Sequence, residues 1–136
     1  MTDDKVQDVL LNFGSMIADS KKLQLKNALK NADDSRYDEV IYAKVKNPTT
    51  VTLLSIFVGA LGVDRFYLGD IALGIVKLLF VLFAPIVVLF LTGSPTLYMI
   101  FLLVWGFAIN IWWLVDIFLC RSKAKEYNFR SIMLLL

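Results

Sequence analysis

The chain is 136 residues long, enough for one modest domain or for a small domain joined to a membrane bundle. Apolar residues make up 58% of it, above the share of roughly 45–50% that is typical of soluble domains. The net charge of +2 gives no indication of nucleic-acid binding. With no histidine and the single cysteine Cys120, the chain lacks a Cys/His zinc site and a Ser-His-Asp catalytic set. We therefore expect a membrane protein that is not an enzyme, with no catalytic residues, cofactor, metal or nucleic-acid partner.

The charged residues divide the chain into two phases. Residues 1–50 carry eight Lys or Arg and eight Asp or Glu, whereas residues 71–119 carry only Lys77 and Asp116. The tail from Arg121 has four basic residues against one acidic residue. We predict three parts: an amphipathic helical region at 1–46 that is soluble or lies on a membrane surface, a membrane domain at 47–120, and a basic C-terminal tail at 121–136.

Residues 1–46 show helical periodicity. Their apolar side chains recur three or four residues apart and charged residues occupy the other positions, which predicts two or three short amphipathic helices. The apolar faces of such helices pack on each other, lie on a membrane surface or bind a protein partner, and the pattern does not choose among these. The N-terminus has no basic region followed by an apolar core, so it does not resemble a secretory signal, and we expect it to lie in the cytosol.

Asn47-Pro48 ends the amphipathic region, because the residue before a proline disfavours continuation of a helix. Three apolar segments follow. The second and third segments, Ile71–Leu91 and Thr96–Leu119, are long enough at ~1.5 Å per residue to cross a hydrocarbon core of ~30 Å. An uncharged turn at residues 92–95 joins them as an antiparallel hairpin. The first segment, Val51–Val63, is shorter. The predicted fold is an all-α integral membrane protein with two spans and a shorter first hydrophobic helix after the amphipathic N-terminal region.

The first apolar segment leaves the topology open. If a helix extends from Val51 to Leu68 and crosses, three crossings place the basic tail outside when the N-terminus is inside, against the positive-inside rule. If the segment dips in and returns, every Lys and Arg falls on the cytosolic side and the turn at 92–95 is the one external loop. We keep both alternatives and favour three crossings of the cell membrane, with a cytoplasmic N-terminus.

A run of small, charged and aromatic residues stands between the first and second segments. It reads Gly59-Ala60-Leu61-Gly62-Val63-Asp64-Arg65-Phe66-Tyr67-Leu68-Gly69-Asp70, and it is followed by Gly74-Ile75-Val76-Lys77-Leu78-Leu79 and later by Ile111-Trp112-Trp113-Leu114-Val115-Asp116. These three stretches, in this order, resemble the TM-two domain family, a two-transmembrane-helix domain with a DRF motif, over about residues 47–120. The resemblance implies a membrane domain of unknown molecular function attached to varied soluble segments. The stretch between the lysine and tryptophan motifs is longer than is usual in the family, which predicts an added crossing.

The motif residues have two expected roles. Small side chains let helix backbones approach closely, and this packing role falls to Ser55, Gly59, Gly62, Gly69 and Gly74. The hairpin brings the start of the second segment and the end of the third to the same side as the DRF motif. We therefore predict a charged cluster, next to Phe66, that serves as a structural clasp or as an ion or headgroup site. Its members are Asp64, Arg65, Lys77 and Asp116.

Two classes of function fit these expectations. The favoured one is a non-catalytic scaffold, anchor or adaptor, in which the apolar helices lie in the lipid bilayer and residues 1–46 bind a protein partner or self-associate. The alternative is a subunit of an oligomeric channel or transporter that uses the intramembrane charged cluster. That alternative requires several copies, because three helices are too few to enclose a path.

Overall fold

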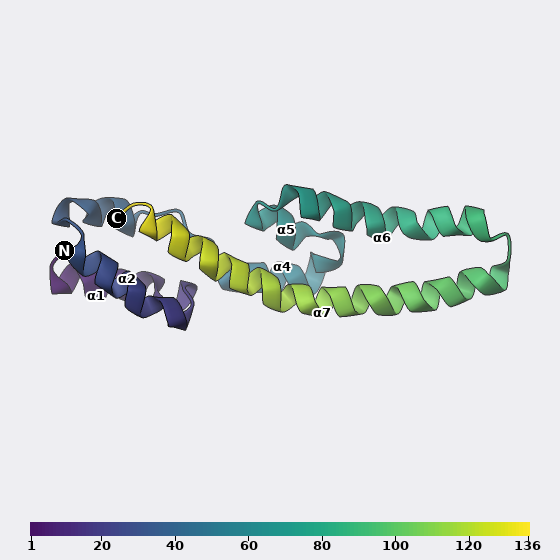
Figure 1. Cartoon of the computed structure of the whole chain (residues 1–136), viewed down its shortest axis with the longest axis horizontal. Coiled ribbons are helices and arrows are strands. Elements are labelled where there is room, and N and C mark those ends of the chain that lie inside the picture. Colours follow the sequence, from purple (N-terminus) through teal and green to yellow (C-terminus); the bar gives the residue numbers. More distant parts are fainter. The chain divides into compact units, whose positions relative to one another are not determined.

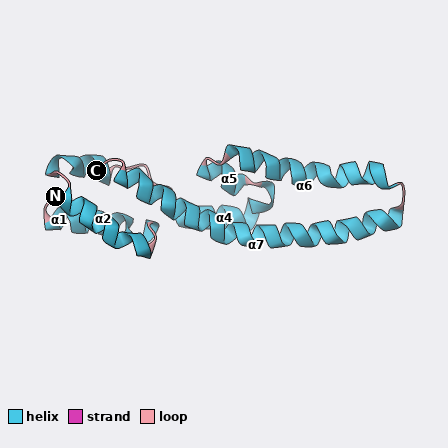
Figure 2. Cartoon of the chain, in the orientation of Figure 1, coloured by secondary structure: helices cyan, strands magenta, loops and turns pink.

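The computed structural model describes residues 1–136 and contains helices and turns without a strand (Figure 2). The predicted all-α class is therefore confirmed. The α-helices are α1 Asp3–Phe13, α2 Asp19–Asn31, α3 Tyr37–Ile41, α4 Pro48–Val58, α5 Val63–Leu68, α6 Ile71–Thr92 and α7 Pro95–Met133. Three short 3-10 turns lie between them, at Gly14–Met16, Asp34–Arg36 and Gly59–Leu61.

The chain forms two compact units, and the first combines both chain ends. It contains residues 1–48 and 122–136, so α1, α2 and α3 pack with the last turns of α7. Its core consists of buried apolar side chains: Val6, Val9, Phe13, Ile17, Leu25, Leu29, Val40 and Ile132. The residues that the sequence assigns to a basic tail are thus helical and contribute Ile132 to this core.

The helices of this N-terminal unit follow directly from the sequence pattern. The prediction of two or three amphipathic helices is confirmed, since α1, α2 and α3 form. In α1, Val6, Val9 and Phe13 are buried at spacings of three and four residues, which places them on one helical face. Asp3 and Asp4 stand in the first turn, where negative charge is favoured by the helix dipole.

Asn128 joins the two chain segments of the N-terminal unit. Its side-chain oxygen accepts a hydrogen bond from the backbone N–H of Lys46 at 2.6 Å, and its Nδ2 donates to the carbonyl of Lys46 at 2.7 Å and to that of Met16 at 2.9 Å. The side chain is fully buried. Asn128 therefore replaces the helical hydrogen bonds that the non-helical segment before α4 lacks.

The second unit, residues 49–121, begins with a short helix. Pro48 occupies the first position of α4, where its missing N–H costs nothing. The helix ends in the 3-10 turn, and Gly62 then adopts a φ of +79°, so the chain turns before α5. The continuous helix expected over Val51–Leu68 is therefore not formed. At 11 residues, α4 spans only ~16 Å, about half of a hydrocarbon core.

The second unit continues with two long apolar helices, α6 and α7, which Figure 1 shows running side by side. Gly93, with a φ of +53°, and Ser94 connect them, so the predicted hairpin turn is present. α6 and α7 have the length and composition to cross a membrane, whereas α4 does not. α6 ends within one residue of its predicted end, but α7 runs past Leu119 to Met133.

Candidate functional site

Asp116 of α7 lies between the two basic side chains of the predicted cluster. Its Oδ2 accepts a hydrogen bond from Lys77 Nζ at 2.5 Å, and its Oδ1 accepts one from the Arg65 guanidinium. Arg65 also pairs with Asp70, at 3.6 Å. Arg65, Lys77 and Asp116 are all buried, with exposed fractions of 7%, 2% and 1%. The structure thus joins α5, α6 and α7 through one buried ion-pair network.

Asp64, the fourth member of the predicted cluster, has neutral partners. Its Oδ2 accepts hydrogen bonds from the Ser55 hydroxyl at 3.0 Å and from the Cys120 thiol at 3.3 Å. Its Oδ1 accepts one from the backbone N–H of Arg65 at 2.9 Å. All of these side chains are buried. The structure therefore brings the four predicted charges into one region, but Asp64 contacts α4 and α7 rather than a basic side chain.

The glycines of the motif allow close contacts between the turn, α5 and α6. A Cβ on Gly62 would lie 2.9 Å from the carbonyl oxygen of Gly74, and one on Gly74 would lie 3.0 Å from the Phe66 ring. The first distance is too short for any side chain, and at the second the Phe66 ring would have to shift by a few tenths of an ångström to admit a Cβ. Gly69 ends α5 with a φ of +87°, a conformation that L-residues rarely adopt.

Two tryptophans of α7 enclose the site. Trp113 donates from its indole Nε1 to the carbonyl oxygen of Ser55 at 2.7 Å, and a Cβ on Gly59 would lie 3.4 Å from its ring. The Trp112 ring lies 5.8 Å from Lys77 Nζ and 6.1 Å from the Phe80 ring. Cation–π attraction adds to the ion pair that holds Lys77 in place.

The predicted packing residue Ser55 and the unpredicted Asp70 have polar roles that the sequence reasoning missed. Ser55 is a hydrogen-bond donor to Asp64 and an acceptor for Trp113, in addition to its packing role beside Gly59. Asp70 provides a second carboxylate for Arg65. Asp70 is the last residue of the first motif stretch, but nothing in the spacing showed that Arg65 turns toward it.

The charged cluster is arranged as a clasp. Both carboxylate oxygens of Asp116 are engaged, and the three paired side chains are withdrawn from water. Removing one member would leave another charge buried without compensation, which costs more than the pair itself gains. A role as an ion or headgroup site stays a prediction, and it would require a ligand to displace one of these contacts.

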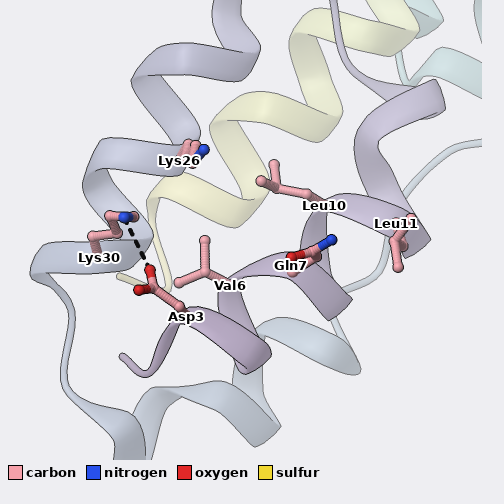
Figure 3. Close-up of a pocket in the computed structure, with 7 residues that line it drawn as sticks. All are labelled: Asp3, Val6, Gln7, Leu10, Leu11, Lys26 and Lys30. Carbon is pink, nitrogen blue, oxygen red and sulfur yellow. Dashed lines mark ion pairs between the residues drawn. The ribbon is translucent and has the colours of Figure 1, made fainter.

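The N-terminal unit has its own pocket, between α1 and α2 (Figure 3). Its volume is about 530 Å³, and it is lined by Asp3, Val6, Gln7, Leu10, Leu11, Lys26 and Lys30. The Lys30 ammonium pairs with Asp3 at 2.9 Å and holds the pKa of that carboxyl below its usual value. A second pocket, of about 390 Å³, shares Leu10, Leu11 and Lys26 with the first. The two pockets adjoin at these shared residues and form one groove, whose lining is part apolar and part charged.

An exposed apolar hairpin with charges enclosed at one end is the construction of a small helical membrane protein. A sequence model of the TM2 domain matches residues 44–93. The family resemblance is thereby confirmed for the glycine, DRF and lysine stretches, whereas the tryptophan stretch with Asp116 lies beyond the match. Searches of curated proteins and of solved structures found no match.

Proposed function

We propose that the protein is a non-catalytic membrane anchor that crosses the bilayer twice and holds a helical adaptor unit at the cytosolic face of the cell membrane. The support for a bilayer is the surface of α6 and α7. In their most apolar windows, only 11% and 6% of residues are buried inside the protein. A core helix of a soluble protein would bury most of such a window, and a lipid environment covers it instead.

The observation that carries the proposal is the packing of both chain ends in one unit. Ile132 lies in the same core as Val6 and Leu29, and Asn128 bonds to the backbone of Lys46. A chain that leaves a compact unit and returns to it must cross the membrane an even number of times. α6 and α7 supply two crossings. The segment of α4 and α5 therefore begins and ends on the same side of the membrane.

Charge distribution supports the cytosolic orientation of this arrangement. With two crossings, the basic residues before α6 and after Cys120 lie on one side, and the external turn carries no charge. This satisfies the positive-inside rule, which three crossings did not. The N-terminal Met and the last turns of α7 are then both cytosolic.

The groove between α1 and α2 is the surface that we assign to a protein partner. Leu11 and Leu23 are 77% and 68% exposed beside it, although both are large apolar residues on the water-facing unit. The fully buried Leu25 and Leu29, by contrast, belong to the core. The channel alternative gains no support from the cluster, whose charges are closed onto one another.

Cysteine labelling in intact cells tests the topology. In a Cys120→Ser background, we expect Ser94→Cys to react with an impermeant external maleimide. We expect Asp19→Cys and Ser131→Cys to react only after the membrane is opened. Retention in the membrane pellet after alkaline carbonate washing is the accompanying check on integration. External labelling at only one of Asp19→Cys and Ser131→Cys would establish an odd number of crossings and overturn the proposal.

A further inference from the structure

Helix α7 has one face that is already occupied. Phe101 and Trp105 line an apolar groove against α6, Trp112 contacts Phe80, and Asp116 binds Lys77. At about 100° of rotation per residue, positions 101, 105, 112 and 116 fall on one side of the helix. The opposite side of α7 makes none of these contacts with α6.

The opposite face of α7 carries a regular exposed seam, which we call the 100–114 seam. Its members are Ile100, Leu103, Phe107, Asn110 and Leu114, and all five are exposed. Their spacing alternates between three and four residues, and the same rotation places them roughly opposite the α6-facing positions. Such alternation is the pattern of a left-handed helix pair, because it keeps one line of side chains facing a partner helix.

Asn110 indicates what this seam contacts. Its Nδ2 donates to the carbonyl oxygen of Gly106 at 2.8 Å, and no other partner within the chain takes its second N–H or its carbonyl oxygen. Lipid tails offer neither donor nor acceptor, so an amide near the middle of an apolar helix is costly until another polar group meets it. A carboxamide is self-complementary, because it both donates and accepts.

We infer that the 100–114 seam pairs with the same seam of a second copy of this chain, with the Asn110 side chains hydrogen-bonded across the interface. This inference rests on the proposed membrane placement. Two copies inserted with the same topology have parallel α7 helices, so position 110 meets its own counterpart. A single polar residue in an otherwise apolar seam then fixes the register of the pair.

Residue-by-residue cross-linking in the membrane is the test. In full-length Cys120→Ser protein, single cysteines are introduced by Leu103→Cys, Phe107→Cys and Leu114→Cys, and Val104→Cys is the matched control. Val104 is 65% exposed on the same helix but lies off the seam. A short bismaleimide should give covalent dimers at the three seam positions and only background at the control.

Substitution of the amide tests its role separately. By energy-transfer dilution in liposomes, Asn110→Leu should weaken self-association by about threefold to tenfold, the range that one interhelical hydrogen bond in a bilayer supports. Asn110→Gln keeps the amide and should retain the association, and Val104→Ala should leave it unchanged. An Asn110→Leu equilibrium equal to that of the wild type would overturn the role assigned to Asn110.

Failure of this inference is distinguishable from failure of the proposed function. Protein that resists carbonate extraction and labels as a two-crossing hairpin, but gives no seam cross-links, would overturn the self-pairing alone. Equal cross-linking at Val104→Cys and Phe107→Cys would overturn it too, because the contact would then have no preferred face. Loss of the protein from the membrane pellet would overturn both.

Discussion

The two units of this chain have opposite constructions. In the N-terminal unit the core is apolar and the ion pairs are on the surface, as with Lys5 and Asp34, which are 38% and 46% exposed. In the second unit the charges are inside, and large apolar residues such as Phe90 and Phe107 are outside. The two units thus expose different kinds of group: the first exposes ion pairs, and the second exposes large apolar side chains.

Ion pairs in the two units are also expected to contribute differently to stability. An exposed pair gains little, since water already solvates both charges and salt screens them. The Lys77–Asp116 pair has no such alternative, so each partner depends on the other. Substitutions matched between the units should therefore differ strongly in cost.

The largest effect is expected at the buried carboxylate. Asp116→Asn leaves Arg65 and Lys77 without their shared counter-charge, and we expect a loss of about 3–5 kcal/mol in the free energy of unfolding. Unfolding in mixed micelles with increasing SDS, followed by tryptophan fluorescence, measures this loss. The matched substitution in the other unit is Glu126→Gln, which removes partly exposed pairs with Lys21 and Arg130 and should cost about 0–1 kcal/mol.

A double variant separates the cost of an unpaired buried charge from the cost of the altered packing. Adding Lys77→Met to Asp116→Asn removes the stranded ammonium while Arg65 keeps Asp70, so part of the stability should return. Equal stability of wild type and Asp116→Asn would show that the charges are solvated, and the contrast between the units would fail.

The same substitution at two exposed leucines tests the outer surfaces. Leu82, 48% exposed in the middle of α6, and Leu23, 68% exposed in α2, are each changed to Asp. We expect Leu82→Asp to disfavour insertion by about 2.5–3.5 kcal/mol, because lipid does not solvate a carboxylate. Leu23→Asp should change the free energy of insertion by no more than about 0.5 kcal/mol relative to the wild type. The membrane-inserted fraction of each variant, measured with an engineered glycosylation site, gives the comparison, and equal fractions would contradict it.

Asn128 provides a smaller test, inside the N-terminal unit. Asn128→Ala removes the partners of the Lys46 N–H and of two carbonyl groups, and we expect a loss of about 1–3 kcal/mol. Amide hydrogen exchange of α1 and α2 in the intact protein measures the loss. Asn12→Ala is the control, because Asn12 bonds only within its own helix and lies on the surface. A cost no larger than that of Asn12→Ala would mean that Asn128 does not join the chain ends.

Periodicity and composition predicted most of the elements. An apolar helical face and a long apolar run are signals that many residues contribute to, so they do not depend on any single side chain. The helices α1, α2, α3 and α6 and the turn at Gly93 follow from this kind of signal. The break between α4 and α5 did not, since it depends on Gly62 taking a left-handed conformation that the sequence permits but does not require. Segment length alone therefore suggested a continuous helix that is not formed.

The site was predictable in its membership and in part of its pairing. Hairpin geometry alone placed Lys77 and Asp116 at a common depth, and the structure joins them. Which acid meets which base depends on side-chain direction, so the separate partners of Asp64 were not foreseen. Asn128 was missed because its role lies in one contact with backbone far away in the sequence, and no periodic pattern records such a contact.

The smallest expected effect concerns pH and the surface of the N-terminal unit. The backbone N–H of Thr2, at 2.9 Å, and then the Lys5 ammonium hold the pKa of Asp34 below its usual value. A folded pKa below the unfolded value of about 3.9 means that Asp34 stabilises the fold above that pH and loses this effect as the pH falls through the folded pKa. Asp34→Asn keeps an oxygen for Thr2 but removes the charge. We therefore expect slightly weaker amide protection of α1 in the variant near pH 6, and a difference from the wild type that vanishes at the lowest pH. Variant and wild type are compared at the same pH, so the pH dependence of intrinsic amide exchange is common to both and cancels. A difference that grows as the pH falls would mean that the carboxylate does not stabilise this surface.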